Sequence, residues 1–167
     1  GLDIRQSKKI LQLLYIISQQ VPFSPNLSDL ARKTTIHRNS LNDYLYYLEE
    51  ARLLYLLQPK NYSVASLQKP EKIYLNNTNL LYALSEDNPN SGTIREVFFY
   101  NQLAGLHQIS QSKEADFLVD NKYTFEIGGR NKTMTQIKNV ENSWLVKDDI
   151  IQPTGRAIPL WMFGFLY

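Results

Sequence analysis

The sequence predicts an α/β (α+β) protein in two parts, a helical module at about residues 1–75 and a mixed sheet with flanking helices at about 76–167. Apolar residues recur with helical spacing early in the chain, and short strand-like segments alternate with helical ones after Asn76. With 43% hydrophobic residues in a chain of 167, there is enough apolar material for a sizeable core. An intrinsically disordered chain is therefore excluded.

The first part reads as three helices that form a helix-turn-helix core. Ile10, Leu13, Leu14 and Ile17 lie on one face of a helix at residues 7–20. Asn26 is placed to cap a short helix at 27–33, and His37 is placed to cap a third helix in which every third or fourth residue is apolar. The outer side of that third helix is polar.

Two strands at residues 53–57 and 72–75 would form a hairpin after the third helix, in the position of a wing. The segments Asn26-Leu27-Ser28-Asp29-Leu30-Ala31, Ser40-Leu41-Asn42-Asp43-Tyr44-Leu45 and Leu48-Glu49 resemble the winged-helix family. The resemblance implies nucleic-acid binding through the third helix and the wing. The candidate nucleic-acid-binding residues are Arg38, Asn39, Asn42, Lys60 and Lys69. Asp43, on the same face, opposes a tight fit to phosphate, and a helical bundle with no nucleic-acid role is the alternative.

The second part is predicted to be a mixed sheet. A helix at residues 93–105, capped by Thr93 or Ser91, precedes strands at 107–110, 115–119 and 123–127. A crossover helix at 133–140 then leads to strands at 143–146 and 160–165. This order of helix, three strands, helix and two strands predicts a mixed α/β sheet.

Composition limits the chemistry. The chain has no cysteine, which excludes disulfides, zinc–thiolate sites and cysteine nucleophiles, and its two histidines are too few for a histidine-rich metal site. The net charge is +2. No stretch approaches the roughly 20 apolar residues of a membrane span, and no signal peptide is present, so we expect a cytoplasmic protein with no membrane partner.

Carboxylates are therefore the candidate metal ligands. Asp116 and Glu126 lie on neighbouring predicted strands, and Glu96 lies on the helix before them. Three such groups suit a weak site for a hard cation such as Mg²⁺ or Mn²⁺, which could polarise a phosphodiester and activate water. The alternative is that Asp116 and Glu126 only form the polar face of a hairpin.

Short segments in a fixed order also resemble a known family. They are Lys72-Ile73-Tyr74-Leu75, Gly92-Thr93-Ile94-Arg95-Glu96, Glu114-Ala115-Asp116-Phe117 and Phe125-Glu126-Ile127. They resemble the C-terminal region, DUF4143, of a bacterial and archaeal family of AAA-type ATPases, in which a winged helix precedes a PD-(D/E)xK, restriction-endonuclease-like domain. The resemblance implies Glu96, Asp116 and Glu126 as catalytic acids.

The same resemblance calls for a lysine at position 128, where this chain has Gly128. Glycine cannot orient water or stabilise phosphorane charge, so we expect a degenerate site without cleavage activity. Lys132 is the residue that could reach back across the permissive Gly128-Gly129 pair, which completes the candidate catalytic set.

The chain lacks the Gly-x-x-x-x-Gly-Lys-Ser/Thr loop that cradles nucleotide phosphates. The resemblance therefore places ATP binding in a missing N-terminal ATPase domain, consistent with a chain that opens at Gly1 without a methionine. We expect an accessory region that binds DNA, with no cofactor of its own beyond the weak metal. The alternatives are a protein-interaction or regulatory tail and an active metal-dependent nuclease.

Overall fold

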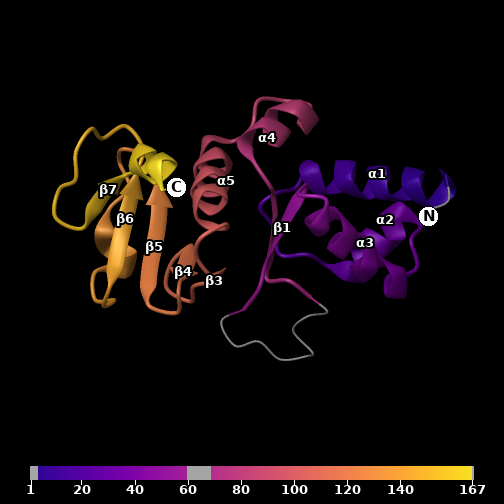
Figure 1. Ribbon diagram of the computed structural model, residues 1–167, viewed down its shortest axis with the longest axis horizontal. Helices are drawn as coiled ribbons and strands as arrows, with labels where there is room; N and C mark the ends of the chain where they lie inside the picture. The colour runs from indigo at the N-terminus through magenta and orange to yellow at the C-terminus, as the bar shows by residue number, and fades with distance from the viewer. Residues whose placement is uncertain (1–3, 60–68, 167) are drawn as a thin grey trace. The chain divides into compact units, whose positions relative to one another are not determined.

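The computed structural model describes residues 4–59 and 69–166. The chain divides into two compact units, which are described separately (Figure 1). Unit 1 comprises Gly1–Gln58 and Tyr62–Pro89, and unit 2 comprises Pro59–Asn61 and Asn90–Tyr167. The sequence-based boundary lay near residue 75, before a helix that the structure groups with unit 1.

Unit 1 consists of three helices, a hairpin and a fourth helix. The helices are α1 (Ile4–Ser18), α2 (Leu27–Thr34) and α3 (Arg38–Glu50). Strands β1 (Leu54–Leu57) and β2 (Lys72–Leu75) pair antiparallel, and α4 (Thr78–Leu84) follows. The predicted three helices and hairpin are thus confirmed. Their inward side chains include the fully buried Leu13, Ile17, Leu41, Leu54 and Ile73.

The two predicted caps of unit 1 are also confirmed. The Asn26 side chain accepts hydrogen bonds from the backbone N–H groups of Ser28 and Asp29 at the start of α2. The His37 ring accepts one from the backbone N–H of Asn39 at the start of α3. Both caps satisfy N–H groups that have no partner within a helix. They fix where α2 and α3 begin.

Unit 2 is a five-stranded mixed sheet with α5 (Ser91–Leu103) packed on it. The strands lie in chain order: β3 (Ile109–Gln111), β4 (Phe117–Val119), β5 (Tyr123–Gly128), β6 (Ser143–Lys147) and β7 (Ala157–Pro159). The first three are antiparallel, and β5, β6 and β7 are parallel. An aromatic cluster of Phe99, Phe117, Phe125 and Phe163 joins the sheet to α5 and to the 3₁₀ helix η3 (Leu160–Phe165).

Several predictions for unit 2 are wrong. Residues 160–165 form η3 rather than a strand, and the strand beside β6 is Ala157–Pro159. In place of a crossover helix at 133–140 there is one 3₁₀ turn, η2 (Met134–Ile137). The cap of α5 is Asn90, which accepts from the N–H of Gly92, and neither Ser91 nor Thr93. Short apolar runs do not distinguish strands from tight helices, which explains the first of these errors.

Candidate functional site

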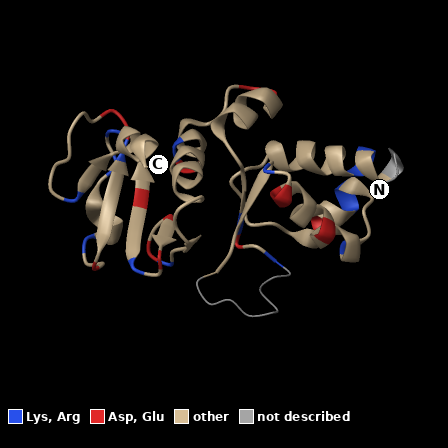
Figure 2. Ribbon diagram, in the orientation of Figure 1, with Lys and Arg blue, Asp and Glu red and all other residues tan. Residues whose placement is uncertain are grey.

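Strand β5 buries one carboxylate in unit 2. Successive strand residues point to opposite faces of a sheet, so Phe125 points to the aromatic cluster and Glu126 to the other face. Figure 2 shows an acidic band on β5, and Glu126 is the acidic residue in that strand. Only 2% of Glu126 is exposed. A buried carboxylate needs a charged or hydrogen-bonding partner, because desolvation of an unpaired charge is costly.

Lys132 is that partner. Its ammonium pairs with Oε1 of Glu126. A Cβ atom placed on Gly128 would collide with the Cβ and Cγ atoms of Lys132, so the lysine stem fills the space that a side chain at 128 would occupy. The chain turns back after Gly129, where the N–H of Lys132 donates to the Gly129 carbonyl at 3.0 Å. The lysine thus reaches Glu126 by way of the space left by Gly128.

The electrostatics of this pair are asymmetric. Burial raises the pKa of Glu126, and the nearby charge of Asp116 raises it further, against the lowering effect of Lys132. The pKa of Lys132 is raised, chiefly by its hydrogen bond to Glu126, with smaller contributions from the charges of Asp116 and Glu96. The second oxygen of Glu126, Oε2, is buried and has no hydrogen-bond partner among the described residues. One carboxylate oxygen is therefore paired with the ammonium and the other is enclosed without a partner from the described residues.

Asp116 and Glu96 differ in how they meet this pair. Asp116 directly precedes β4, and its Oδ2 accepts the backbone N–H of Ile127 at 2.7 Å, beside Glu126. Glu96 belongs to α5 and acts on Lys132 only as the weakest of the charges named above. Within residues 4–59 and 69–166, no group of three or more His, Cys, Asp or Glu side chains is placed to share a metal ion. The metal site stays a prediction.

Two cationic residues near this site were not predicted. Arg95 of α5 donates from Nε to Oδ2 of Asp148 at 3.0 Å, and its guanidinium lies 3.3 Å from where a Cβ on Gly129 would be. Lys147 is the β6 partner of Gly128 in the parallel ladder. No sequence pattern indicated either residue, because Lys147 is placed by the pairing of β5 with β6 and Arg95 by the position of α5 near Gly129 and Asp148.

Unit 1 contains a cleft of about 890 Å³. It lies between the segment that leads into α2 and the first turns of α3. Its lining residues are polar or basic for the most part: Ser24, Pro25, Asn26, Leu27, Ser28, Arg38, Asn39, Asn42 and Lys69. Four of the five predicted nucleic-acid-binding residues, namely Arg38, Asn39, Asn42 and Lys69, line this one cleft, and Lys60 falls outside the described residues.

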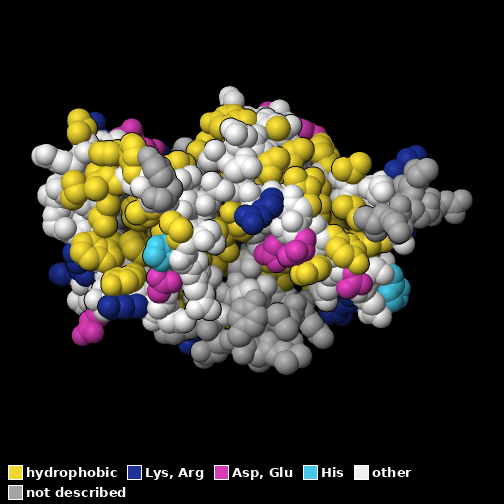
Figure 3. All heavy atoms as spheres, in the orientation of Figure 1, with side chains coloured by type: hydrophobic (Ala, Val, Ile, Leu, Met, Phe, Trp, Pro, Cys, Tyr) yellow, Lys and Arg dark blue, Asp and Glu magenta, His cyan; other side chains and the backbone are white. Residues whose placement is uncertain are grey.

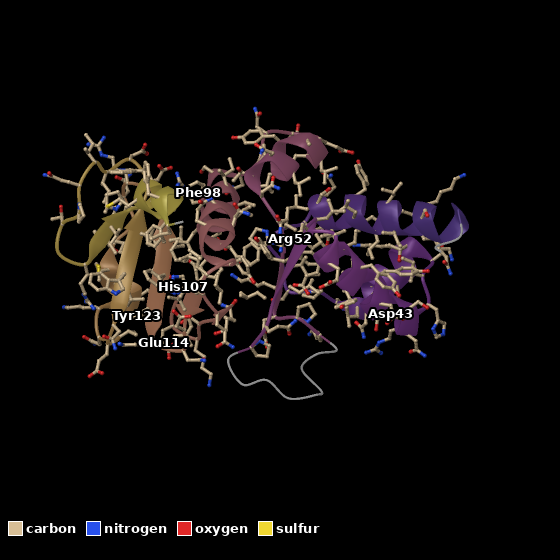
Figure 4. All side chains as sticks on the ribbon, viewed as in Figure 1. Asp43, Arg52, Phe98, His107, Glu114 and Tyr123 are labelled. Carbon is tan, nitrogen blue, oxygen red and sulfur yellow. The ribbon has the colours of Figure 1, made fainter. Side chains whose placement is uncertain are left out.

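The charge of the cleft is positive. Of the lining residues that the structure describes, Arg38 and Lys69 are charged, and both are exposed. Asp29, one residue beyond the lining, pairs with Arg32 at 2.6 Å and with Lys33 at 2.8 Å, which hold the pKa of its carboxyl below the ordinary value. Asp43 lies on the exposed side of α3 and is not part of the lining (Figure 4). Among the described lining residues, an anion in the cleft would thus meet two cations and no carboxylate.

Unit 2 also exposes apolar side chains. Figure 3 shows hydrophobic side chains gathered on its visible surface. The large exposed ones at the C-terminal end are Trp161, Met162, Phe165 and Leu166 of η3 and its cap. A patch of this kind is typical of a contact surface. It is the feature that suits the sequence-based alternative of a protein-interaction role.

Together these features define a two-unit mixed α/β protein with a basic cleft in unit 1 and a lysine–carboxylate pair in unit 2. The chain belongs to the family named "Domain of unknown function (DUF8612)", whose model matches residues 2–91, more than half of the 167. No curated protein and no solved structure matches the chain. Among the described residues, no helix is both long and apolar enough to cross a membrane.

The family match corrects the resemblance drawn from the sequence. The chain was expected to belong to the DUF4143 region of AAA-type ATPases, and it matches a different family. That assignment is wrong. The expectations of a missing ATPase domain and of ATP binding rested on it alone, so nothing supports them now. The segments that suggested it were short, and hydrophobic strands with single acidic residues recur in many α/β folds.

Proposed function

We propose that unit 1 is a winged-helix module that binds nucleic acid through its cleft. The order of three helices followed by an antiparallel hairpin supports a winged helix. The observation that carries the proposal is the convergence of Arg38, Asn39, Asn42 and Lys69 in one cleft without a lining carboxylate. Cationic and amide side chains of this kind contact phosphates and base edges.

Binding of DNA by the full chain tests this proposal. We expect a gel shift at low salt, with an affinity that falls steeply as salt rises, because neutralised phosphates release counterions. Replacing Arg38→Gln and Lys69→Gln together should weaken binding and reduce the salt slope by about 2, one for each lost phosphate contact. The DNA is offered both as single strands and as duplex.

A matched control removes the same charge elsewhere in unit 1. Lys8→Gln with Arg52→Gln changes two exposed residues that do not line the cleft. This pair should leave the salt slope nearly unchanged. If the two double variants weaken binding equally, the cleft is not the site. The absence of any shift at about 100 μM protein, the weak end of non-specific affinity, rejects nucleic-acid binding by this chain.

A second candidate function for unit 2 is metal-dependent phosphodiester hydrolysis. Position 128 is glycine, yet an ammonium group is supplied to Glu126 by Lys132. The buried, unpartnered Oε2 of Glu126 and the neighbouring Asp116 provide oxygen donors that suit Mg²⁺ or Mn²⁺. Such a cation polarises the scissile phosphate. The ammonium of Lys132 would stabilise the charge that develops on it.

The sequence-based expectation of an inactive site rested on Gly128 alone. An assay of DNA cutting by variants of Lys132 and Asp116 therefore tests it. DNA is incubated with the full chain and Mn²⁺, and cutting is compared with that of Lys132→Ala and Asp116→Asn. Loss of cutting by about a hundredfold or more in both variants supports hydrolysis. Lys138→Ala, which changes an exposed lysine beyond η2, is the control. Equal background cutting in all four proteins rejects this function.

A further inference from the structure

The size of the unit 1 cleft indicates what enters it. Its volume of about 890 Å³ falls in the range of small-molecule sites, roughly 300–1,000 Å³. A phosphate group alone would leave most of this space empty. The bases of a duplex are stacked inside it, so a duplex presents mainly its backbone to the protein surface and cannot fill a deep cleft. The cleft therefore suits a larger piece of nucleic acid that can leave the stack.

The lining has the chemistry for both halves of a nucleotide. Arg38 and Lys69 supply positive charge for a phosphate. Asn39 and Asn42 carry side-chain amides, each with a donor and an acceptor, which pair with base edges. Such edges are fully accessible only in an unpaired base. Cations and amides in one recess therefore favour an unpaired nucleotide as the ligand.

An exposed aromatic side chain lies beside the amides. Tyr46 follows Asn42 by one turn on the same side of α3, and 54% of it is exposed. The ring centroids of Tyr46 and Tyr47 lie 6.1 Å apart, and Tyr47 is also exposed. Proteins that bind single strands combine a basic groove with aromatic rings on which bases stack. Tyr46 offers such a ring one helical turn after Asn42, which lines the cleft.

We propose that the cleft binds an unpaired nucleotide of single-stranded DNA, with its phosphate at Arg38 and Lys69. Its base edge meets Asn39 and Asn42, and the neighbouring base stacks on Tyr46. This inference rests on the proposed function of unit 1, and it names the substrate class. It sets this cleft apart from a surface that only follows the backbone of a duplex.

Fluorescence anisotropy with the full chain tests the inference. The probes are labelled single strands of about a dozen nucleotides, within the size range of single-strand sites, and duplexes of the same sequence. We expect the single strand to bind at least about tenfold more tightly, since stacking adds to the phosphate contacts. Tyr46→Leu should weaken single-strand binding by about tenfold and leave duplex binding unchanged. Tyr46→Phe, which keeps the ring, should retain the affinity.

The control is Tyr82→Leu, which changes a tyrosine of α4 that is 59% exposed and does not line the cleft. Its single-strand affinity should match that of the wild type. Equal affinities for single strand and duplex, with no effect of Tyr46→Leu, would overturn the inference while nucleic-acid binding itself stands. Absence of binding to both probes would overturn the inference and the proposed function together.

Discussion

In unit 2, the side chain of Lys132 occupies the space that a side chain at position 128 would need. The missing side chain at Gly128 leaves room for the methylene groups of Lys132, whose ammonium then reaches Glu126. Loss of the charged partner of a buried carboxylate strongly destabilises the fold, because the cost of desolvating the carboxylate is no longer offset. The glycine therefore matters here for the volume it leaves free.

This arrangement predicts the effect of Gly128→Ala. The added methyl group collides with Lys132, so the lysine must move or the loop must shift, and we expect a loss of about 1–3 kcal/mol in the free energy of unfolding. Urea unfolding measures the change. Gly105→Ala is the matched control, since a Cβ there meets nothing within 4 Å, and its effect should stay below about 1 kcal/mol. Equal stability of wild type and Gly128→Ala would contradict the packing of Lys132 against Gly128.

Two of the three helix caps predicted from the sequence were identified correctly, and the cap of α5 was missed by one residue or more. The caps Asn26 and His37 were found because a cap and its helix are neighbours in the chain. The pair of Lys132 with Glu126 was only an open alternative, because it depends on the path of the loop after Gly129. Arg95 and Asp148 are 53 positions apart, and nothing in the sequence connected them.

A second residue-scale prediction concerns pH. Burial raises the pKa of Glu49, whose Oε1 accepts the backbone N–H of Leu56 at 2.9 Å. Between the ordinary value of 4.5 and the raised pKa, the folded chain holds more protons than the unfolded chain, so Glu49 makes stability fall as pH rises through that window. Glu49→Gln keeps the acceptor oxygen and does not ionise.

We therefore expect the stability of Glu49→Gln relative to wild type to be higher at neutral pH than at a pH below the ordinary pKa of 4.5. Chemical unfolding at both pH values measures it. The charge of Glu50 contributes to the raised pKa of Glu49, so Glu50→Gln should reduce this pH dependence and leave part of it in place. A constant difference between Glu49→Gln and wild type across this range would show that the carboxyl titrates normally.

At the scale of elements, the strands with strong apolar character were predicted at the right positions. The last predicted strand, at residues 160–165, was wrong, because these residues form a 3₁₀ helix. Strands β1, β2, β5 and β6 overlap their predictions almost residue for residue. In residues 160–165, the buried positions are Leu160 and Phe163, a spacing of three that matches the three residues per turn of a 3₁₀ helix. The sequence did not reveal this spacing, because Trp161 and Phe165 are apolar and yet exposed, so the whole run looked like a buried strand.

The start of α5 gives a prediction at this scale. Asn90→Ala removes the side chain that accepts the N–H of Gly92 at 2.8 Å, and we expect a loss of about 0.5–2 kcal/mol. Ser91→Ala, at the position the sequence favoured for the cap, should cost clearly less. Thermal or urea unfolding of unit 2 distinguishes them. If Ser91→Ala is the more damaging change, then the helix begins one residue later than the structure has it.

At the scale of the molecule, the polar face of α3 could be predicted and the cleft could not. Arg38, Asn39 and Asn42 were found because the buried leucines of α3 define which side of the helix faces solvent. The cleft also requires residues 24–28 and Lys69, which come together only when the hairpin and α2 fold around α3. The mixed sheet followed from the order of elements, whereas its fifth strand, β7, was missed.

The distribution of tryptophan makes the two units separately observable. Both tryptophans of the chain, Trp144 and Trp161, belong to unit 2, so their fluorescence reports on unit 2 alone. Four of the five α-helices in the described part of the chain belong to unit 1, so helical circular dichroism reports mainly on unit 1. Each unit has its own buried core, which favours separate unfolding.

We therefore predict that Leu41→Ala, which leaves a cavity in the core of unit 1, lowers the circular dichroism midpoint, with a loss of about 2–5 kcal/mol. The tryptophan midpoint should stay where it is in the wild type. Val97→Ala, at a fully buried position of α5, should do the reverse and move mainly the fluorescence. Coincident shifts of both signals in either variant would mean that the units unfold as one cooperative structure.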